Sequence, residues 1–162
     1  MRKLYIAAIA AVALSFTSAQ AEAQDATQDV TFEVQAINEI SLSAPTASLT
    51  ISAANAGSAP TSVVSSGLTY SITTNESNRK IVAEIDAAMP SGVTLAVVLA
   101  APSGGTSAGS VSLSATAQNA VTGISTLNAS GLSLTYTLSA TSAAGVVASD
   151  TRTVTYTIVA GA

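Results

Sequence analysis

The feature that most constrains the fold of this chain is strict alternation of apolar with polar or small residues. Val30, Phe32 and Val34 alternate with polar residues, and the same spacing recurs at 93–99 and 154–158. A period of two with many β-branched residues is typical of a strand that buries one face. The sequence therefore predicts about eight short strands, the less regular ones lying at 49–51, 68–72, 81–85, 111–113 and 132–138.

Turn-forming residues separate these stretches. Polar residues fill 74–78, and Pro and Gly occupy 89–92 and 101–105. No segment repeats apolar residues at the spacing of an amphipathic helix. Many short strands joined by such turns predict an all-β fold, a single antiparallel β-sandwich of the Ig-like, Greek-key or jelly-roll kind.

The first residues have the organisation of a secretory signal peptide. Two basic residues precede an uninterrupted apolar run at 4–14, and small residues then form cleavage patterns after Ala21 and Ala23. The apolar run is shorter than the roughly 20 residues that a membrane-spanning helix needs. We therefore expect a signal-peptide helix at 1–23 that is cleaved, one β-sandwich domain at 24–162, a secreted or cell-surface location, and no membrane anchor after cleavage.

The composition argues against whole classes of chemistry. The 162 residues contain no His, Cys or Trp, and only 9% are charged, against roughly 25% in typical soluble domains. Without His or Cys there is no Ser-His-Asp or Cys-His machinery, no zinc site of the usual ligands and no disulfide. Five basic residues are too few to cover a phosphate backbone. We expect no enzyme, no cofactor, no metal and no nucleic acid partner.

Three patterns in the sequence nevertheless have a chemical as well as a structural interpretation. Residues 105–109 match the G-x-S-x-G nucleophile elbow, which needs a histidine base and a strand-turn-helix context. Glu84 and Asp86 share one face of a predicted strand, where they could serve acid–base chemistry, bind Ca²⁺ or form a solvated outer face. Asn75 and Asn128 fit the N-glycosylation pattern in predicted turns, and modification there or on Ser and Thr stays open.

The N-terminal alternation leaves two interpretations open. An extended strand at a free terminus can pair with its own sheet or complete the sheet of a neighbour, and both outcomes use the same residues. The segment at 24–40 is the candidate exchangeable strand. The candidate donor residues at the subunit interface are Val30, Phe32, Val34 and Ala36.

Both ends of the mature chain resemble a known group of proteins. After the signal peptide come the alternating strand at 29–34 and a closing Gly-to-strand segment at 145–158. This arrangement resembles the small secreted bacterial β-sandwich proteins of the fimbrial and spore-coat-U type. The disulfide common in such subunits is absent here. The resemblance implies a structural protein that assembles into pili or surface coats by strand exchange.

These observations predict a secreted, non-enzymatic structural subunit of an extracellular filament or surface coat, a homo-polymer formed through strand addition. A charge-poor surface lowers the electrostatic repulsion between packed copies. The alternative is a monomeric adhesion or carbohydrate-binding module with a surface glycan as its partner. Such a module presents exposed aromatic side chains, whereas the mature chain places all of its aromatics at predicted inward strand positions: Phe32, Tyr70, Tyr136 and Tyr156.

Overall fold

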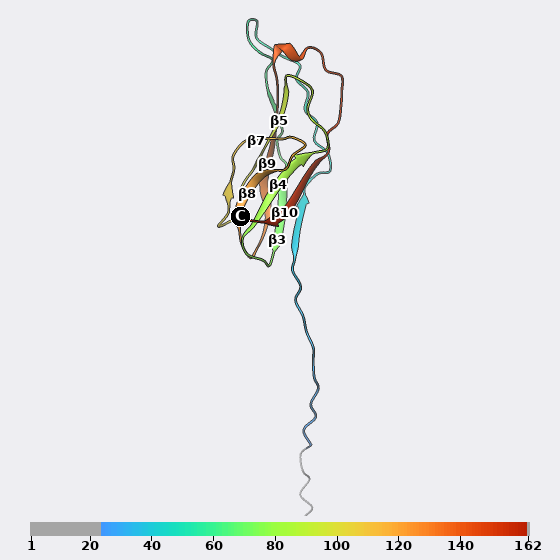
Figure 1. The fold of residues 1–162 in the computed structure, drawn as a ribbon, viewed down its shortest axis with the longest axis vertical. Helices are drawn as coiled ribbons and strands as arrows, with labels where there is room; N and C mark the ends of the chain where they lie inside the picture. The colour runs from blue at the N-terminus through green and yellow to red at the C-terminus, as the bar shows by residue number, and fades with distance from the viewer. Residues whose placement is uncertain (1–23, 162) are drawn as a thin grey trace, which may run out of the picture. The chain divides into compact units, whose positions relative to one another are not determined.

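The computed structural model describes residues 24–161, so the predicted signal-peptide helix lies outside the described residues. The chain divides into two units after Glu33, and the unit that starts at Val34 contains the ten strands of the described residues (Figure 1). These strands form two antiparallel sheets, which confirms the predicted all-β sandwich. In the described part of the chain, no helix has the length and apolar character to cross a membrane.

The larger sheet has six strands in the order β1-β3-β9-β5-β7, with β2 also pairing with β9. The smaller sheet has four strands in the order β10-β4-β8-β6. The strands of the larger sheet are β1 (Asn38–Leu42), β2 (Val63–Val64), β3 (Thr69–Thr74), β5 (Val93–Leu99), β7 (Val111–Ser112) and β9 (Leu127–Ala140). Those of the smaller sheet are β4 (Arg79–Ile85), β6 (Thr106–Ser107), β8 (Gln118–Ile124) and β10 (Val154–Ala160).

The core lies between the two sheets and is built from the inward half of each alternating strand. On β4, Ile81, Ala83 and Ile85 are buried, while the residues between them are partly exposed. On β5, Val97 and Leu99 are buried in the same way. Burial of each such aliphatic side chain stabilises the fold by roughly 1.5–3 kcal/mol. The period-two pattern therefore specifies which face of each strand enters the core.

Two predicted strands are wrong. Residues 30–36 do not form the chain's own first strand, because residues 24–37 lie in no strand and the first one is β1 at Asn38–Leu42. Residues 49–51 also form no strand, although Leu49 packs against the core. In both places the sequence alternates as in a strand, but the backbone is not paired with a neighbouring strand. Sequence analysis also missed four strands: β1, β2, β6 and β8.

Two strands leave one edge unpaired on the same side of the sandwich. Within residues 24–161, β1 pairs only with β3, and β10 pairs only with β4. The two strands approach each other without forming a ladder, as the cyan and dark red arrows show (Figure 1). Each therefore carries a row of backbone groups that a further strand could pair with.

Candidate functional site

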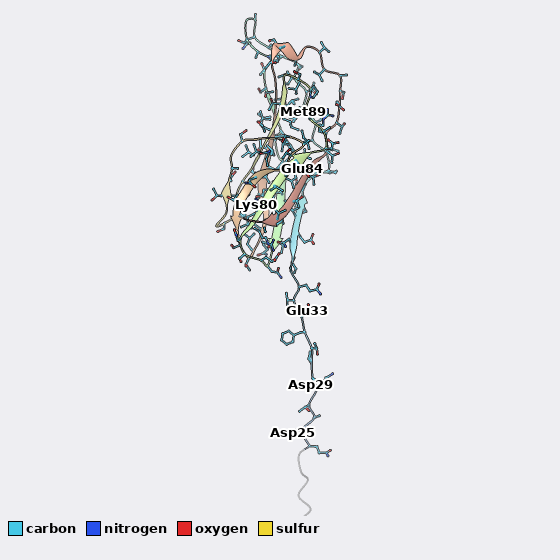
Figure 2. The ribbon with its side chains drawn as sticks, in the orientation of Figure 1. Asp25, Asp29, Glu33, Lys80, Glu84 and Met89 are labelled. Carbon is cyan, nitrogen blue, oxygen red and sulfur yellow. The ribbon has the colours of Figure 1, made fainter. Side chains whose placement is uncertain are left out.

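The predicted donor residues lie in an extended, exposed segment. The exposed fraction of the side chain is 73% for Val30, 88% for Phe32 and 79% for Val34, and Ala36 is also exposed. The expected inward position of Phe32 is therefore wrong. Asp25, Asp29 and Glu33 are spaced along the same segment (Figure 2). This segment therefore carries an apolar stripe flanked by acids, and no strand of the described residues pairs with it.

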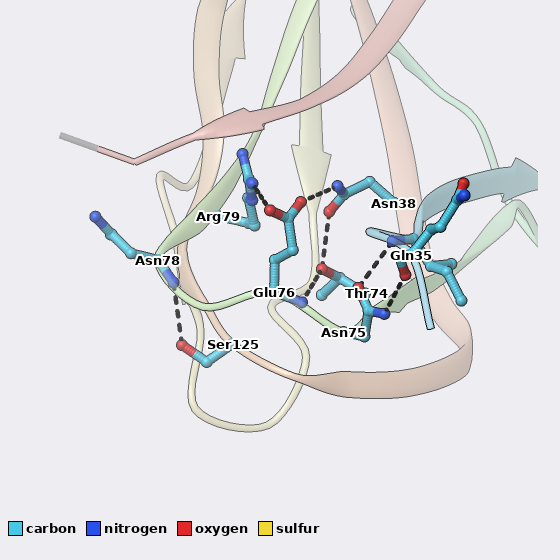
Figure 3. Close-up of polar contacts among 9 residues, drawn as sticks. Gln35, Asn38, Thr74, Asn75, Glu76, Asn78, Arg79 and Ser125 are labelled. Carbon is cyan, nitrogen blue, oxygen red and sulfur yellow. Dashed lines mark hydrogen bonds and ion pairs between the residues drawn. The ribbon is translucent and has the colours of Figure 1, made fainter. Parts of the chain in front are cut away.

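The end of this segment is held by the turn between β3 and β4 (Figure 3). The Asn75 Nδ2 group donates a hydrogen bond to the Gln35 carbonyl at 2.7 Å. The Ile37 N–H donates to Asn75 Oδ1 at 2.8 Å, and the Asn75 N–H donates to the Ile37 carbonyl at 3.2 Å. A single asparagine thus fixes the point at which the N-terminal segment leaves the sandwich. Its side-chain amide, one of the two glycosylation candidates, is occupied by these contacts.

Four further side chains support that turn (Figure 3). Asn38 Nδ2 donates to the Glu76 carboxylate, which also forms an ion pair with Arg79. The buried Thr74 hydroxyl donates to Asn38 Oδ1 at 2.8 Å and accepts the Glu76 N–H at 3.1 Å. The hydrogen bond from Asn38, followed by the one from Arg79, lowers the pKa of Glu76 below its usual value. The turn is therefore a cross-linked support for the segment before β1.

Residues 30–36, the predicted donor segment, and β10 have similar sequences. Residues 30–36 read Val-Thr-Phe-Glu-Val-Gln-Ala, and β10 reads Val-Thr-Tyr-Thr-Ile-Val-Ala. Both also end at the same turn, because the Gly161 N–H donates to the Asn78 carbonyl at 2.7 Å. In β10 the residues equivalent to Val30, Phe32 and Val34 pack against the core. The donor segment therefore has the residue types of a strand that covers a sheet's inner face.

Two adjoining clefts open at the opposite end of the sandwich. The larger, about 830 Å³, has Val93, Leu138 and Ala140 of the six-stranded sheet on its floor. No residue of the four strands of the smaller sheet lines it; its walls come from the segments at 49–54, 89–90 and 141–152. The smaller cleft, about 460 Å³, reaches Leu95, Leu134 and Tyr136. Both are lined by Leu49 and Arg152. At the larger cleft, irregular segments and not strands of the smaller sheet lie over the larger sheet.

Arg152 stands where the two clefts meet. Its guanidinium forms an ion pair with Asp150 at 2.6 Å and donates from Nε and Nη2 to the Ala88 carbonyl at 3.3 and 3.2 Å. The hydrogen bond from Arg152 lowers the pKa of Asp150. Asp86 accepts the Thr153 N–H at 3.1 Å. The loop that carries Met89 (Figure 2) is thereby tied to the start of β10.

The three tyrosines of the described residues lie in the core or against it. Tyr70 and Tyr136 are buried, and Tyr156 packs against the core with its hydroxyl donating to the Tyr136 hydroxyl at 2.8 Å. Burial raises the pKa of Tyr70 to about 12. It also raises the pKa of Tyr136 and Tyr156. Among the described residues, Phe32 is the exposed aromatic side chain.

The other site residues predicted from the sequence lie on strands or in hydrogen bonds that support the fold. Ser107 of the 105–109 motif lies on β6, where its hydroxyl donates to the Leu99 carbonyl at 2.6 Å. Glu84 is partly exposed on β4, whereas Asp86 holds the start of β10 as described above. Across the described residues, no group of three His, Cys, Asp or Glu side chains could hold a metal ion. Asn128 is exposed but lies within β9, not in the predicted turn.

Comparison with known proteins adds no relative: no family model matches the chain, and neither does any curated protein or solved structure. The exposed segment, the free strand edges and the clefts are therefore the features that bear on function.

Proposed function

We propose that this protein is a secreted, non-enzymatic structural subunit that forms an extracellular filament or coat by strand addition between copies. The observation that carries the proposal is the exposed apolar stripe of Val30, Phe32 and Val34 in an extended segment with no strand partner. Exposed stripes of this kind mark interaction surfaces. The unpaired edges of β1 and β10 supply backbone groups suited to a further strand.

The free energies of burial and association favour strand pairing over apolar contact alone. Burial of three such side chains contributes roughly 5–9 kcal/mol before any cost. Lost translational and rotational freedom alone costs an estimated 4–15 kcal/mol. Apolar burial by itself therefore leaves little net affinity. Main-chain hydrogen bonds along an added strand supply the remainder and set the direction of the incoming chain.

The experiment compares purified chain 24–162 with two variants by electron microscopy and size-exclusion chromatography. We expect filaments or a ladder of oligomers from the unaltered chain. Phe32→Asp should abolish them because a charge enters the apolar stripe. Val64→Asp is the matched control, since Val64 is also exposed but lies on β2, outside the stripe and both clefts.

The proposal fails if the unaltered chain stays monomeric at high concentration and deletion of residues 24–36 changes nothing. Defined hits of that monomer on a glycan array would instead support the carbohydrate-binding alternative. Mass spectrometry of exported protein tests the secretory part, for which we expect a new N-terminus after Ala21 or Ala23.

A further inference from the structure

We propose that the outer face of the six-stranded sheet packs against the same face of a second copy, so that two copies form a two-fold symmetric pair. The outer face consists of the outward residues of β3, β5 and β9, which alternate with inward ones, together with Val64 of β2 and Ser112 of β7. The contact uses neither residues 24–37 nor the clefts, so it goes beyond the proposed function. It adds a lateral contact that joins neighbouring filaments or the copies of a coat.

The first argument is the distribution of charge between the two sheets. The sequence has no charged residue at 40–75 or at 87–149, and these ranges include every strand of the larger sheet except β1. Within the described part of that sheet, Glu39 of β1 is the one charged residue. In the smaller sheet, β4 alone carries three, among them Lys80 and Glu84 (Figure 2). Charges on a surface keep copies of a protein apart, and the outer face of the larger sheet lacks them beyond its β1 edge.

The second argument is that strand pairing makes this face self-complementary. Val64 and Ala96 both lie opposite Thr137 of β9, and Ser112 lies opposite Ala96. Val98 follows Ala96 on the same face of β5. Cross-strand partners share one face of a sheet, so these side chains form a continuous uncharged surface. Hydroxyl groups both donate and accept hydrogen bonds, which lets a face of this kind pair with a copy of itself.

The third argument is that two apolar side chains are exposed on this face. The exposed fraction is 57% for Val64 and 36% for Val98. All other large apolar side chains that are exposed among the described residues lie between Val30 and Leu42 or line the larger cleft. Packing of the outer face against a second copy removes Val64 and Val98 from water, which is favourable for apolar groups.

The fourth argument is the size of the face. Strand β9 has 14 residues, a length of roughly 46 Å at about 3.3 Å per residue. Three adjacent strands about 4.8 Å apart give a width of roughly 14 Å. The face therefore offers roughly 650 Å² per copy and roughly 1,300 Å² for a pair, above the 1,000 Å² or so expected of a specific interface. Twisted sheets pack face to face with their strands about 30° apart, so the twist of the sheet is compatible with the contact.

The side chains of the face favour a second copy over a carbohydrate. The aromatic residues of β3 and β9 are Tyr70 and Tyr136, and both are buried in the core. The outer face of the described strands thus presents no aromatic ring to a sugar. A contact between identical faces is isologous and closes as a pair. Together with strand addition along a filament, it produces filaments that associate in pairs.

Analytical ultracentrifugation of chain 24–162 with Phe32→Asp tests the contact, because this background lacks strand addition. We expect a dimer. A further Val98→Asp should weaken the dimer at least tenfold, since each copy then brings a negative charge to the contact. Val64→Asp, on the short strand β2, should act in the same way. Thr157→Asp is the matched control, because Thr157 is exposed on β10 of the smaller sheet.

A mixing experiment shows whether the two faces meet. A 1:1 mixture of Val98→Asp and Val98→Lys chains, both in the Phe32→Asp background, should recover the dimer that the Val98→Asp chain loses. Equal dissociation constants for the Val98→Asp and Thr157→Asp variants, with circular dichroism showing both folded, would overturn the inference. A monomeric background chain that sediments with cellulose particles would overturn it in favour of a carbohydrate partner.

Single cysteines locate the contact, and the natural absence of cysteine makes the trapping specific. Among the variants Ser133→Cys, Thr135→Cys and Thr137→Cys, at least one lies close to the two-fold axis. On oxidation it should give at least tenfold more covalent dimer than Thr157→Cys. Covalent dimer from Thr157→Cys in place of these three would overturn the inference.

The outcome for this contact is distinguishable from the outcome for strand addition. In a chain with intact residues 24–37, Val64→Asp should leave filaments that lie singly where the unaltered chain gives pairs. A dimer of the Phe32→Asp chain without filaments of the unaltered chain would sustain the lateral contact and overturn strand addition. Filaments of the unaltered chain together with a monomeric Phe32→Asp chain would do the reverse.

Discussion

Residues 30–36 and 154–160 show how one pattern reaches two structural outcomes. Both segments alternate Val, an aromatic residue and an aliphatic residue, and both end at the turn after β3. Residues 154–160 pair with β4 and place Tyr156 against the core. Residues 30–36 form no strand and leave Phe32 at 88% exposure. Alternation makes a segment competent to be a strand, and an available sheet edge makes it one.

The largest expected effect is the difference in stability between substitutions at Tyr156 and at Phe32. Tyr156→Ala should lower the free energy of unfolding by about 2–4 kcal/mol, because it leaves a cavity beside Tyr136. Phe32→Ala should change the stability of the monomer by less than about 0.5 kcal/mol, because that side chain is exposed. Urea denaturation of both variants at low protein concentration measures the difference. Similar losses for the two would show that residues 30–36 pack in the monomer.

Alkaline pH should destabilise the sandwich, and the N-terminal segment should not contribute to this loss of stability. A tyrosine whose pKa is raised on folding is held in its neutral form by the folded state. Its contribution to the free energy of unfolding is therefore complete below about pH 10, the pKa of an unfolded tyrosine. That contribution is lost as the pH rises toward the pKa of the folded state. For Tyr70, with a folded pKa of about 12, that contribution is roughly 2–3 kcal/mol. Urea midpoints from pH 8 to 12 should fall. A chain without residues 24–33, which contain no tyrosine, should show the same fall.

A smaller change brings β10 closer to the donor sequence. Tyr156→Phe makes its aromatic position the same as Phe32 and removes the hydroxyl that binds the Tyr136 hydroxyl. We expect a loss of about 1 kcal/mol, the value of one such hydrogen bond with a partner left buried. Thermal unfolding measures it, with Tyr136→Phe as the reciprocal control. An unchanged unfolding temperature would mean that the hydrogen bond between the two hydroxyls does not stabilise the packing of β10.

The smallest effect should appear at the junction with the segment. Asn75→Ala removes the side-chain bonds to Gln35 and Ile37. Amide hydrogen exchange at Ile37 should accelerate at least tenfold, while global stability falls by about 1 kcal/mol or less. Exchange at Val30 and Phe32 should already be fast in the unaltered chain. Protection of those two amides in the monomer would contradict the observed absence of strand pairing.

Sequence reasoning succeeded where alternation coincided with pairing. It located β5 at 93–99 and the starts of β7 and β10 correctly. It missed β8, where Ala120 and Val121 are both buried because the register shifts opposite Ile81. A period-two pattern cannot reveal a strand whose bulge turns two consecutive side chains inward. It also predicted a strand at 49–51, where Leu49 packs against the core from an irregular segment.

The candidate site divides in the same way. Val30, Phe32, Val34 and Ala36 were identifiable from their spacing, and their exposure came from the structure. The anchoring role of Asn75 and the cleft over Leu138 had no local signal, since each joins segments distant in sequence. Arg152 was visible only as one of few basic residues. Its position between the two clefts depends on how the connection before β10 crosses the sandwich.

The sequence by itself determined the all-β class, the inward face of most strands and the lack of cysteine, because these depend on composition and on a period of two along the chain. The tertiary structure alone decided which alternating segments became strands. It left residues 30–36 exposed and the inner face near Leu138 without a covering strand. The physical reason is that a strand is stabilised by hydrogen bonds and side-chain pairs with a neighbour. For residues 154–160 that neighbour is β4, whereas no strand of the described residues pairs with residues 30–36.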